Sequence, residues 1–331
     1  MTDTHSITTV EKMKIGFIGL GNVGAKLAAS LVRNGYEVMV KDVDPAQMGP
    51  LIEQGALTGE SGQSVAENSD VVITCLPSPS VSALVMEEAN GVLAGLSDGK
   101  IWLEMSSTDA DEVRRIGEMV SAKGGIPIDC PVSGGCHRAE TGNISIFVGG
   151  ERAAFERVLP LLTVVGRSIL HTGPLGTASI MKVATNYLAG VQLISTGEAF
   201  MVAKKAGVDL NVAYEAIRIS SGNSFVHETE GQLILNGSYN INFTMDHEVK
   251  DLTLFDDLGK KYDLPLELSP LCVQIMRDGL KRYGPRARSS MVVKRLEDDC
   301  GVDLRAQGFP EYLTDEEPEG AGFEVQIKNR A

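Results

Sequence analysis

The first part of the chain alternates short apolar runs with stretches whose apolar residues recur at helical spacing. KIGFIG, YEVMVKD, SDVVITCLP and KIWLEM are typical of buried strands, and AKLAASLVRNG between the first two is typical of a helix. GIPIDCP and NISIFVGG predict two further strands. Strands that alternate with helices indicate a doubly wound parallel sheet. The pattern therefore predicts an α/β domain over residues 13–175.

The pattern changes after about residue 176. Helical spacing predicts helices over residues 177–206, 209–219, 246–263 and 268–283, with a turn at SSGNS, while strand patterns are scarce. We expect an all-helical domain over residues 176–296, joined to the first domain by one long helix. Residues 297–331 hold ten acidic and three basic side chains, which predicts a solvated acidic tail.

The first strand runs directly into glycines spaced G-x-G-x-x-G. Gly19 permits a tight turn, Gly21 lets the backbone approach a pyrophosphate, and Gly24 lets helix and strand pack closely. The helix N-terminus adds free N–H groups and the positive end of its dipole. The motif and its flanking elements predict a Rossmann domain that binds a dinucleotide. Its cofactor turn consists of Gly19, Leu20, Gly21, Asn22, Val23 and Gly24.

An acidic residue, Asp42, closes the second strand. A carboxylate at this place can accept hydrogen bonds from the adenosine ribose hydroxyls and repel a 2′-phosphate. The next residue is Val43, so no arginine stands there to bind that phosphate. The presence of Asp42 and the absence of an arginine beside it favour NAD over NADP.

Three loops of small or hydroxyl-bearing residues follow predicted strands, at residues 77–80, 106–108 and 133–135. Ligands of doubly wound sheets bind beyond the carboxyl ends of the strands, so these loops should lie beside the cofactor. We expect the cofactor to contact Leu76, Pro77 and Ser106. Of Ser106 and Ser107, one is expected to cap the following helix and the other to face the ligand, which makes Ser107 a candidate substrate contact.

The loop at residues 133–135 has the composition of an anion site. Ser133, Gly134 and Gly135 can present a hydroxyl and backbone N–H groups to a carboxylate. An ordinary turn has the same composition, so the position beside the dinucleotide site decides the interpretation. We expect these three residues to bind a small carboxylate-bearing substrate.

The long predicted helix carries Lys182 and Asn186 one turn apart on the same face. Most helical lysines face solvent. If this face meets the first domain, burial would lower the pKa of Lys182 from its usual value of about 10.4, toward that of a useful base.

Composition excludes several classes of protein. The net charge of −14 argues against a nucleic-acid or anionic-membrane partner, and no apolar run approaches the roughly 20 residues of a membrane span. The polar lead of residues 1–12 lacks the pattern of a signal or transit peptide. Five scattered cysteines match no zinc or disulfide spacing. We therefore expect a cytoplasmic protein without a bound metal.

Four blocks together resemble the β-hydroxyacid dehydrogenase family, which includes 3-hydroxyisobutyrate dehydrogenase, over roughly residues 13–295. The blocks are GFIGLGNVG, DCPVSGGCHRAETGNISIFVGG, GPLGTASIMKVATN and HEVKDLTL, and EMSST is similar to a further segment. The resemblance implies that Lys182 is catalytic, that Ser133, Gly134 and Asn186 contact substrate, and that Ser106 and Lys250 contact the cofactor. The chain departs from the family pattern at Cys130, Cys136, His137, Arg138 and Thr185.

The resemblance implies NAD-dependent oxidation of a small β-hydroxyacid to its semialdehyde. One alternative is an NAD(P)H-dependent reductase of tartronate semialdehyde, succinic semialdehyde or a sulfo-aldehyde. Another is a non-catalytic NAD-binding protein, against which the intact Lys182, Asn186 and Ser133 argue. An imine reductase of similar fold is disfavoured because that class generally lacks the lysine. The small residues of the long helix suggest a homodimer or homotetramer.

Overall fold

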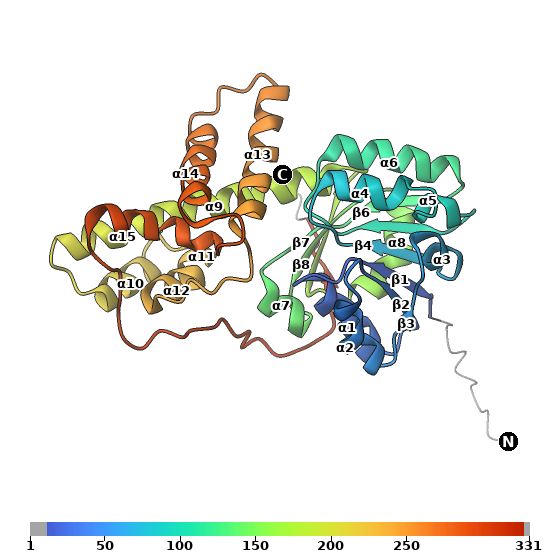
Figure 1. The fold of residues 1–331 in the computed structure, drawn as a ribbon, viewed down its shortest axis with the longest axis horizontal. Coiled ribbons are helices and arrows are strands. Elements are labelled where there is room, and N and C mark those ends of the chain that lie inside the picture. The colour runs from blue at the N-terminus through green and yellow to red at the C-terminus, as the bar shows by residue number, and fades with distance from the viewer. Residues whose placement is uncertain (1–11, 328–331) are drawn as a thin grey trace.

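The computed structural model describes residues 12–327 as two lobes joined by the long helix α9 (Thr177–Lys205) (Figure 1). One lobe is a sheet flanked by helices, and the other is entirely helical. The polar lead of residues 1–11 and the end of the predicted tail, residues 328–331, lie outside this range. The predicted division into an α/β part followed by a helical part agrees with this architecture.

Six parallel strands form one half of the sheet, in the order β3-β2-β1-β4-β5-β6. They are β1 (Ile15–Ile18), β2 (Val38–Lys41), β3 (Leu57–Thr58), β4 (Val71–Thr74), β5 (Ile101–Glu104) and β6 (Ile126–Asp129). The helices around them are α1 (Gly24–Arg33), α2 (Pro45–Glu53), α3 (Gly62–Glu67), α4 (Pro79–Glu87), α5 (Val92–Gly95), α6 (Ala110–Ala122) and α8 (Arg152–Leu162).

The central strands are buried on both faces because helices cover both sides of the sheet. In β4, Val71 and Ile73 contribute to one apolar cluster together with residues of α1 and α8, while Val72 contributes to another with residues of α3 and α6. Side chains of a strand alternate between faces, so each strand supplies both clusters. This explains why these strands are almost continuous apolar runs in the sequence.

The other half of the sheet runs in the opposite direction, so the sheet is mostly rather than wholly parallel. Strand β8 (Ser145–Gly149) is antiparallel to β6 and to β7 (Val132–Ser133), whereas β9 (Ser168–Gly173) and β10 (Phe323–Glu324) are parallel to β8. Between β6 and β8 the chain forms only β7 and the short helix α7 (Cys136–Thr141). These elements turn the chain back along the edge of β6 instead of carrying a crossover helix over the sheet.

The helical lobe packs around α9 with the long helices α13 (Met245–Lys261) and α14 (Leu268–Tyr283). Four shorter helices and one 3₁₀ turn complete it: α10 (Leu210–Arg218), α11 (Phe225–Glu228), α12 (Glu230–Asn236), η1 (Ser289–Val292) and α15 (Lys294–Cys300). The predicted helices agree with α9, α10, α13 and α14 within two residues at each end. Helices α11, α12 and α15 are too short to give a periodic signal in the sequence.

Close packing explains part of the small-residue content of α9. A Cβ at Gly190 would lie 2.8 Å from the Glu248 carboxylate, and a Cβ at Gly197 would lie 2.6 Å from Val293. Both glycines therefore allow neighbours within the same lobe to approach α9. They do not by themselves point to a subunit interface.

The acidic segment after α15 is mostly exposed, as predicted, but it is not detached from the molecule. It leaves the helical lobe, crosses below the molecule in Figure 1 and reaches the sheet lobe, where β10 pairs with β9. Among the described residues, no helix is long and apolar enough to cross a membrane.

The glycine-rich turn between β1 and α1 shows which glycines the fold itself requires. Gly19 has φ +96°, and a Cβ there would lie 2.3 Å from the Cys75 carbonyl oxygen. A Cβ at Gly24 would lie 2.1 Å from the Gly19 carbonyl oxygen. Around Gly21, by contrast, no atom lies within 4 Å of the position that a Cβ would take. Gly19 and Gly24 are thus fixed by internal packing, and Gly21 is not.

We expect Gly24→Ala to lower the free energy of unfolding by about 1–3 kcal/mol, because the added methyl group forces the turn and α1 apart. Gly21→Ala is the matched control, since it adds the same methyl group to the same turn without a clash, and should cause no loss. Urea denaturation of the two variants beside the wild type makes the measurement. Equal stability of the two variants would contradict the packing argument.

Candidate functional site

The glycine-rich turn lies at the carboxyl end of β1 and has the geometry of a dinucleotide site. Gly21 and Asn22 are exposed, and Val23 caps α1 without a side-chain hydrogen bond. No acidic residue stands in the first turn of α1, so its N-terminus carries no competing negative charge. Because nothing within the chain requires a glycine at position 21, a ligand that approaches the backbone there explains it. These residues fit the pyrophosphate of NAD.

Asp42 ties the end of β2 to this turn. Its Oδ2 accepts a hydrogen bond from the Leu20 N–H at 2.7 Å, and its Oδ1 accepts one from the Asp44 N–H at 2.9 Å. Each carboxylate oxygen keeps a second acceptor position that a ribose hydroxyl can use. Val43 beside it is 95% exposed and offers no group for a 2′-phosphate. The arrangement fits the predicted preference for NAD.

Ser106, Leu76 and Pro77 are brought together at the ends of β5 and β4. The buried Ser106 hydroxyl donates a hydrogen bond to Glu104 and accepts one from the Leu76 N–H at 2.7 Å. Burial raises the pKa of the Glu104 carboxyl. Ser106 thus holds the loop that carries Pro77, with one acceptor position of its hydroxyl left over. Glu104 was not predicted as part of the site.

The expectation that Ser106 or Ser107 caps the next helix is wrong. The N-cap of α6 is Asp109, whose Oδ1 accepts hydrogen bonds from the N–H groups of Asp111 and Glu112 at 2.8 and 2.9 Å. Asp109 stands immediately before the helix, where an N-cap side chain can reach these groups. Both serines are therefore free of the capping role.

Asp129, at the end of β6, fixes the start of α9. Its Oδ1 accepts a hydrogen bond from the Gly176 N–H, and its Oδ2 accepts from the N–H and the hydroxyl of Ser179, each at 2.8 Å. Burial raises the pKa of this carboxyl, while the three hydrogen bonds lower it. The helix that carries Lys182 is thereby held against the sheet. An acid that ends a buried strand, as in IPID, is the signal that could have identified Asp129.

A continuous polar chain joins the two lobes at Lys182. Lys182 is only 8% exposed, and its ammonium group donates to Asn186 Oδ1 at 2.8 Å, while Asn186 Nδ2 donates to Asp251 Oδ2 at 2.5 Å. Asp251 Oδ1 lies 2.7 Å from the Lys250 Nζ, which also donates to the carbonyl of Ser107 at 2.6 Å. The structure thus brings together Lys182, Asn186, Lys250 and Ser107, all of which were predicted.

Asp251 is the central residue of this chain, and the sequence analysis missed it. It is fully buried on α13, the helix that also carries Lys250. A buried carboxylate needs a partner, and Asp251 has the Asn186 amide and the Lys250 ammonium. The adjacent Lys-Asp pair in an otherwise amphipathic helix was the available signal.

Burial lowers the pKa of Lys182 to about 8, with the nearby Lys250 ammonium acting in the same direction. The carboxylates of Asp251 and Glu248 oppose this shift. Desolvation therefore outweighs the attraction of two acids, because an ammonium group loses its hydration when it is buried. A lysine with this pKa can both release and accept a proton near neutral pH.

The predicted substrate loop, here taken as residues 133–138, runs from β7 into α7. Gly134 and Gly135 have φ values of +129° and +88°, a conformation that glycine adopts without strain. His137 stacks on Phe225 of α11, with 6.4 Å between ring centroids, and the Arg138 guanidinium lies 5.0 Å from the same ring. The loop thus contacts the helical lobe. Among the described residues, no hydrogen bond links residues 133–135 to Lys182 or Asn186.

His171 and His247 each make contacts that are typical of structural residues. His171 Nε2 lies 2.9 Å from the Gly150 carbonyl oxygen, and its ring packs on Phe155. His247 Nδ1 lies 3.1 Å from the Thr244 hydroxyl. Lys182 is therefore the stronger candidate for a base.

Comparison with known proteins supports the two-part organisation. Residues 14–173 match the model of the NAD-binding domain of 6-phosphogluconate dehydrogenase. Residues 176–296 match a model described as NAD-binding of NADP-dependent 3-hydroxyisobutyrate dehydrogenase. The second match covers the helical lobe, whereas Asp42, which is predicted to bind the ribose, lies in the first.

Curated relatives match over almost their whole length. The chain is 34% identical to 2-(hydroxymethyl)glutarate dehydrogenase of Eubacterium barkeri over 295 residues, which is 89% of this chain and 98% of that protein. It is 32% identical to 2-hydroxy-3-oxopropionate reductase of Escherichia coli, covering 86% and 97% of the two chains. With NAD-dependent L-serine dehydrogenase of Pseudomonas aeruginosa it shares 31% identity, covering 86% and 98%.

Solved structures of other proteins match this fold over most of the chain. The 3-hydroxyisobutyrate dehydrogenase of Mycobacterium tuberculosis with L-serine matches with a TM-score of 0.79 and 26% identity, covering 86% of this chain and 99% of that one. An imine reductase of Myxococcus stipitatus in complex with NAD+ matches at 0.59 with 16% identity, covering 86% and 100%, which shows a shared fold alone. The chain belongs to the β-hydroxyacid dehydrogenase family and is an NAD-dependent oxidoreductase that acts on a CH–OH group.

Proposed function

We propose that the protein oxidises the hydroxyl group of a small β-hydroxyacid to the semialdehyde, with Lys182 as general base. The observation that carries this proposal is the buried Lys182 with its pKa near 8, hydrogen-bonded to Asn186 at the junction of the lobes. The same residues serve the reverse reaction, and the Escherichia coli relative is named as a reductase. Reduction of a semialdehyde is therefore the second candidate.

The proton steps follow from the chain's own residues. In oxidation, neutral Lys182 accepts the hydroxyl proton of the substrate; in reduction, its ammonium form donates a proton to the oxygen that was the carbonyl. Asn186 orients the Lys182 nitrogen, and Asp251 orients the Asn186 amide. Across that amide, the Asp251 carboxylate stabilises the charge that Lys182 gains. NAD supplies the acceptor for the hydrogen removed from carbon.

The cofactor contacts are also part of the proposal. The backbone of residues 19–24 binds the pyrophosphate at the N-terminus of α1, and Asp42 binds the ribose hydroxyls. Leu76, Pro77 and Ser106 face the nicotinamide half. The Lys250 ammonium, held by Asp251 and the Ser107 carbonyl, adds a fixed positive charge beside the cofactor. Support comes from the open position at Gly21 and from the spare acceptor positions of Asp42.

The substrate carboxylate binds the N–H groups and hydroxyl of Ser133, Gly134 and Gly135, with Ser107 nearby and Asn186 at the substrate hydroxyl. Hydroxymethylglutarate, L-serine and hydroxyisobutyrate, named in the relatives, each carry a carboxylate and a hydroxymethyl group on one carbon. Hydroxy-oxopropionate has the same skeleton with an aldehyde. We infer a 3-hydroxypropionate with one substituent on carbon 2, which differs among the relatives.

A cytoplasmic location and a homo-oligomeric state belong to the proposal as well. All five cysteines are free thiols, as expected in a reducing compartment. Helix α9 exposes Met181, Leu188 and Val202, which are spaced by multiples of seven and therefore lie on one face. Such an apolar stripe is suited to pairing with a second copy of α9.

The first experiment follows nicotinamide absorbance with NAD or NADP and a substrate panel that contains 3-hydroxyisobutyrate, L-serine, glycerate and 2-(hydroxymethyl)glutarate. We expect NAD reduction with at least one of them. Lys182→Ala should lower kcat by about 10²–10⁴-fold, the usual contribution of a positioned base, without changing the Kd of NAD. Lys204→Ala, which removes an exposed lysine from the same helix, is the control. Full activity of Lys182→Ala would rule out its role as base.

The pH dependence should follow the protonation of Lys182. Oxidation needs the neutral amine, so kcat/KM for oxidation should rise with pH and level off above a midpoint near 8. Reduction needs the ammonium form and should fall over the same interval. Steady-state rates between pH 6 and pH 10 in both directions make the measurement. Profiles that are flat across this range would show that Lys182 does not titrate during turnover.

The assembly is measured by light scattering. We expect a mass of two or four chains for the wild type. Val202→Glu places a charge in the apolar stripe of α9, where Val202 is 70% exposed, and should shift the mass toward one chain. Val208→Glu, at an exposed apolar residue beyond the end of α9, is the control. A wild-type mass of one chain would refute the homo-oligomer.

A further inference from the structure

The chain beyond α15 is an addition to the part that matches the family, because the second family model ends at residue 296. We call residues 301–327 the strap. The strap leaves α15 in the helical lobe and ends on β9 in the sheet lobe (Figure 1). It therefore connects the two lobes a second time, independently of α9.

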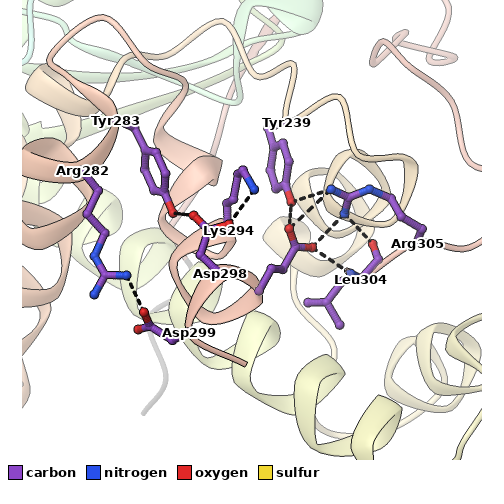
Figure 2. Close-up of polar contacts among 9 residues, drawn as sticks. Tyr239, Arg282, Tyr283, Lys294, Asp298, Asp299, Leu304 and Arg305 are labelled. Atoms are coloured by element: carbon purple, nitrogen blue, oxygen red, sulfur yellow. Dashed lines mark hydrogen bonds and ion pairs between the residues drawn. The ribbon is translucent and has the colours of Figure 1, made fainter. Parts of the chain in front are cut away.

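The strap is anchored at its root by a buried carboxylate. Glu297 on α15 is 2% exposed and accepts hydrogen bonds from the Tyr239 hydroxyl, the Leu304 N–H at 2.8 Å and the Arg305 guanidinium at 2.7 Å. Figure 2 shows Tyr239, Leu304 and Arg305 converging on this carboxylate. Removing one partner of such a buried network costs more than breaking a surface pair. The first residues of the strap are thus fixed to the helical lobe.

Three further contacts keep the strap on the helical lobe before it crosses. The Phe309 ring packs edge-on against Tyr214 at 4.9 Å, and the Phe309 carbonyl accepts a hydrogen bond from Asn236 at 3.0 Å. The Ser238 hydroxyl donates to the Glu311 carbonyl at 3.1 Å. The crossing therefore begins after residue 311.

On reaching the sheet lobe, the strap binds the end of α7. Asp315 Oδ2 accepts hydrogen bonds from the Thr141 hydroxyl and from the Asn143 amide, the latter at 2.8 Å. The Asn143 amide also donates to the Glu317 carbonyl at 2.9 Å. Thr141 is the last residue of α7, whose first turn is the end of the substrate loop. Asp315 thus holds the end of α7, the helix that begins directly after Gly135 and contains residues 136–138 of the loop.

The far end of the strap is built into the sheet. The Phe323 and Val325 N–H groups donate to the carbonyls of Arg167 and Ile169 at 2.8 and 2.7 Å. A Cβ at Gly322 would lie 1.9 Å from the Gly166 carbonyl oxygen, so this approach requires a glycine. The strap is therefore fixed at both ends and at α7 between them.

We propose that the strap is a positioning element for the reaction: through the end of α7 it holds the substrate loop at a fixed place relative to Lys182, whose helix α9 is held to the sheet by Asp129. The inference rests on the proposed function, in which the substrate carboxylate binds residues 133–135 and its hydroxyl group meets Lys182. A substrate held at both ends requires a fixed spacing between this loop and Lys182. Asp315 is the positioning residue of the strap, because its carboxylate accepts hydrogen bonds from both Thr141 and Asn143.

The ion pairs of the strap contribute little to holding it on the sheet lobe. Glu317 lies 3.8 Å from Arg138 with both side chains partly exposed, and Glu324 pairs with the half-exposed Arg152 at 2.6 Å. Exposed pairs of this kind contribute little and are screened by salt. The hydrogen bonds of Asp315 and the close fit at Gly322 are therefore the contacts to change.

The experiment compares Asp315→Ala and Gly322→Val with two matched variants in the full-length protein. Asp315→Asn keeps an oxygen that can accept from Thr141 and Asn143, which are both neutral donors. Glu316→Ala removes an exposed neighbouring acid and controls for the loss of charge. The measurements are kcat and KM with hydroxyisobutyrate as substrate and NAD as cofactor, the Kd of NAD alone, and hydrogen exchange of residues 136–141.

Asp315→Ala and Gly322→Val should raise the substrate KM by about 10-fold, as expected for the loss of about one hydrogen bond of positioning. The Kd of NAD should stay within about 2-fold, because the glycine-rich turn is held by β1 and β2. Exchange of residues 136–141 should become faster in both variants. Asp315→Asn and Glu316→Ala should behave like the wild type.

Faster exchange of residues 136–141 with an unchanged substrate KM would overturn the proposal, because the strap would then only stabilise the fold. Unchanged exchange in both variants would overturn it as well, since the strap would not hold α7. Exchange needs no substrate. A wild-type protein that turns over no member of the panel would therefore refute the proposed function separately, while exchange still decides whether the strap holds α7.

Discussion

The arrangement of the molecule depends on one desolvated ammonium group. Lys182 loses its hydration where α9 packs against α13, and this burial lowers its pKa to about 8 although two carboxylates act against the shift. The cost is tolerable because Asn186 accepts its hydrogen bond and Asp251 compensates the charge through the same amide. The charged groups that act on this pKa all stand on α13, so the packing of α13 against α9 produces this environment.

Three buried carboxylates each hold one part of the candidate site in place. Asp129 fixes the first turn of α9 to the sheet, Glu104 fixes Ser106 and the loop beside it, and Asp251 fixes Asn186 and Lys250. All three are buried acids whose oxygens accept hydrogen bonds from other elements. None of them is a candidate base, yet together they determine the geometry in which Lys182 would act.

Two of the residues that depart from the family pattern contact the helical lobe. His137 and Arg138, which distinguish the substrate loop, both contact the Phe225 ring of the helical lobe. The strap contacts the end of the same α7 region through Asp315. The substrate loop is thus held between two elements that belong to, or start from, the helical lobe, which links its position to the spacing of the lobes.

The sequence by itself determined the elements whose signals are local. Apolar runs and helical spacing predicted most strands and all long helices, and the glycine spacing predicted the turn at residues 19–24, because each depends only on neighbours along the chain. Tertiary structure decided the rest: the reversal of β8, the capping of α6 by Asp109, the place of Asp251 beside Asn186, and the return of the acidic segment to β9. These features join residues that are distant in sequence, and no periodicity records such a contact. The burial of Lys182 belongs to this second group, since its pKa depends on the packing of α13 against α9.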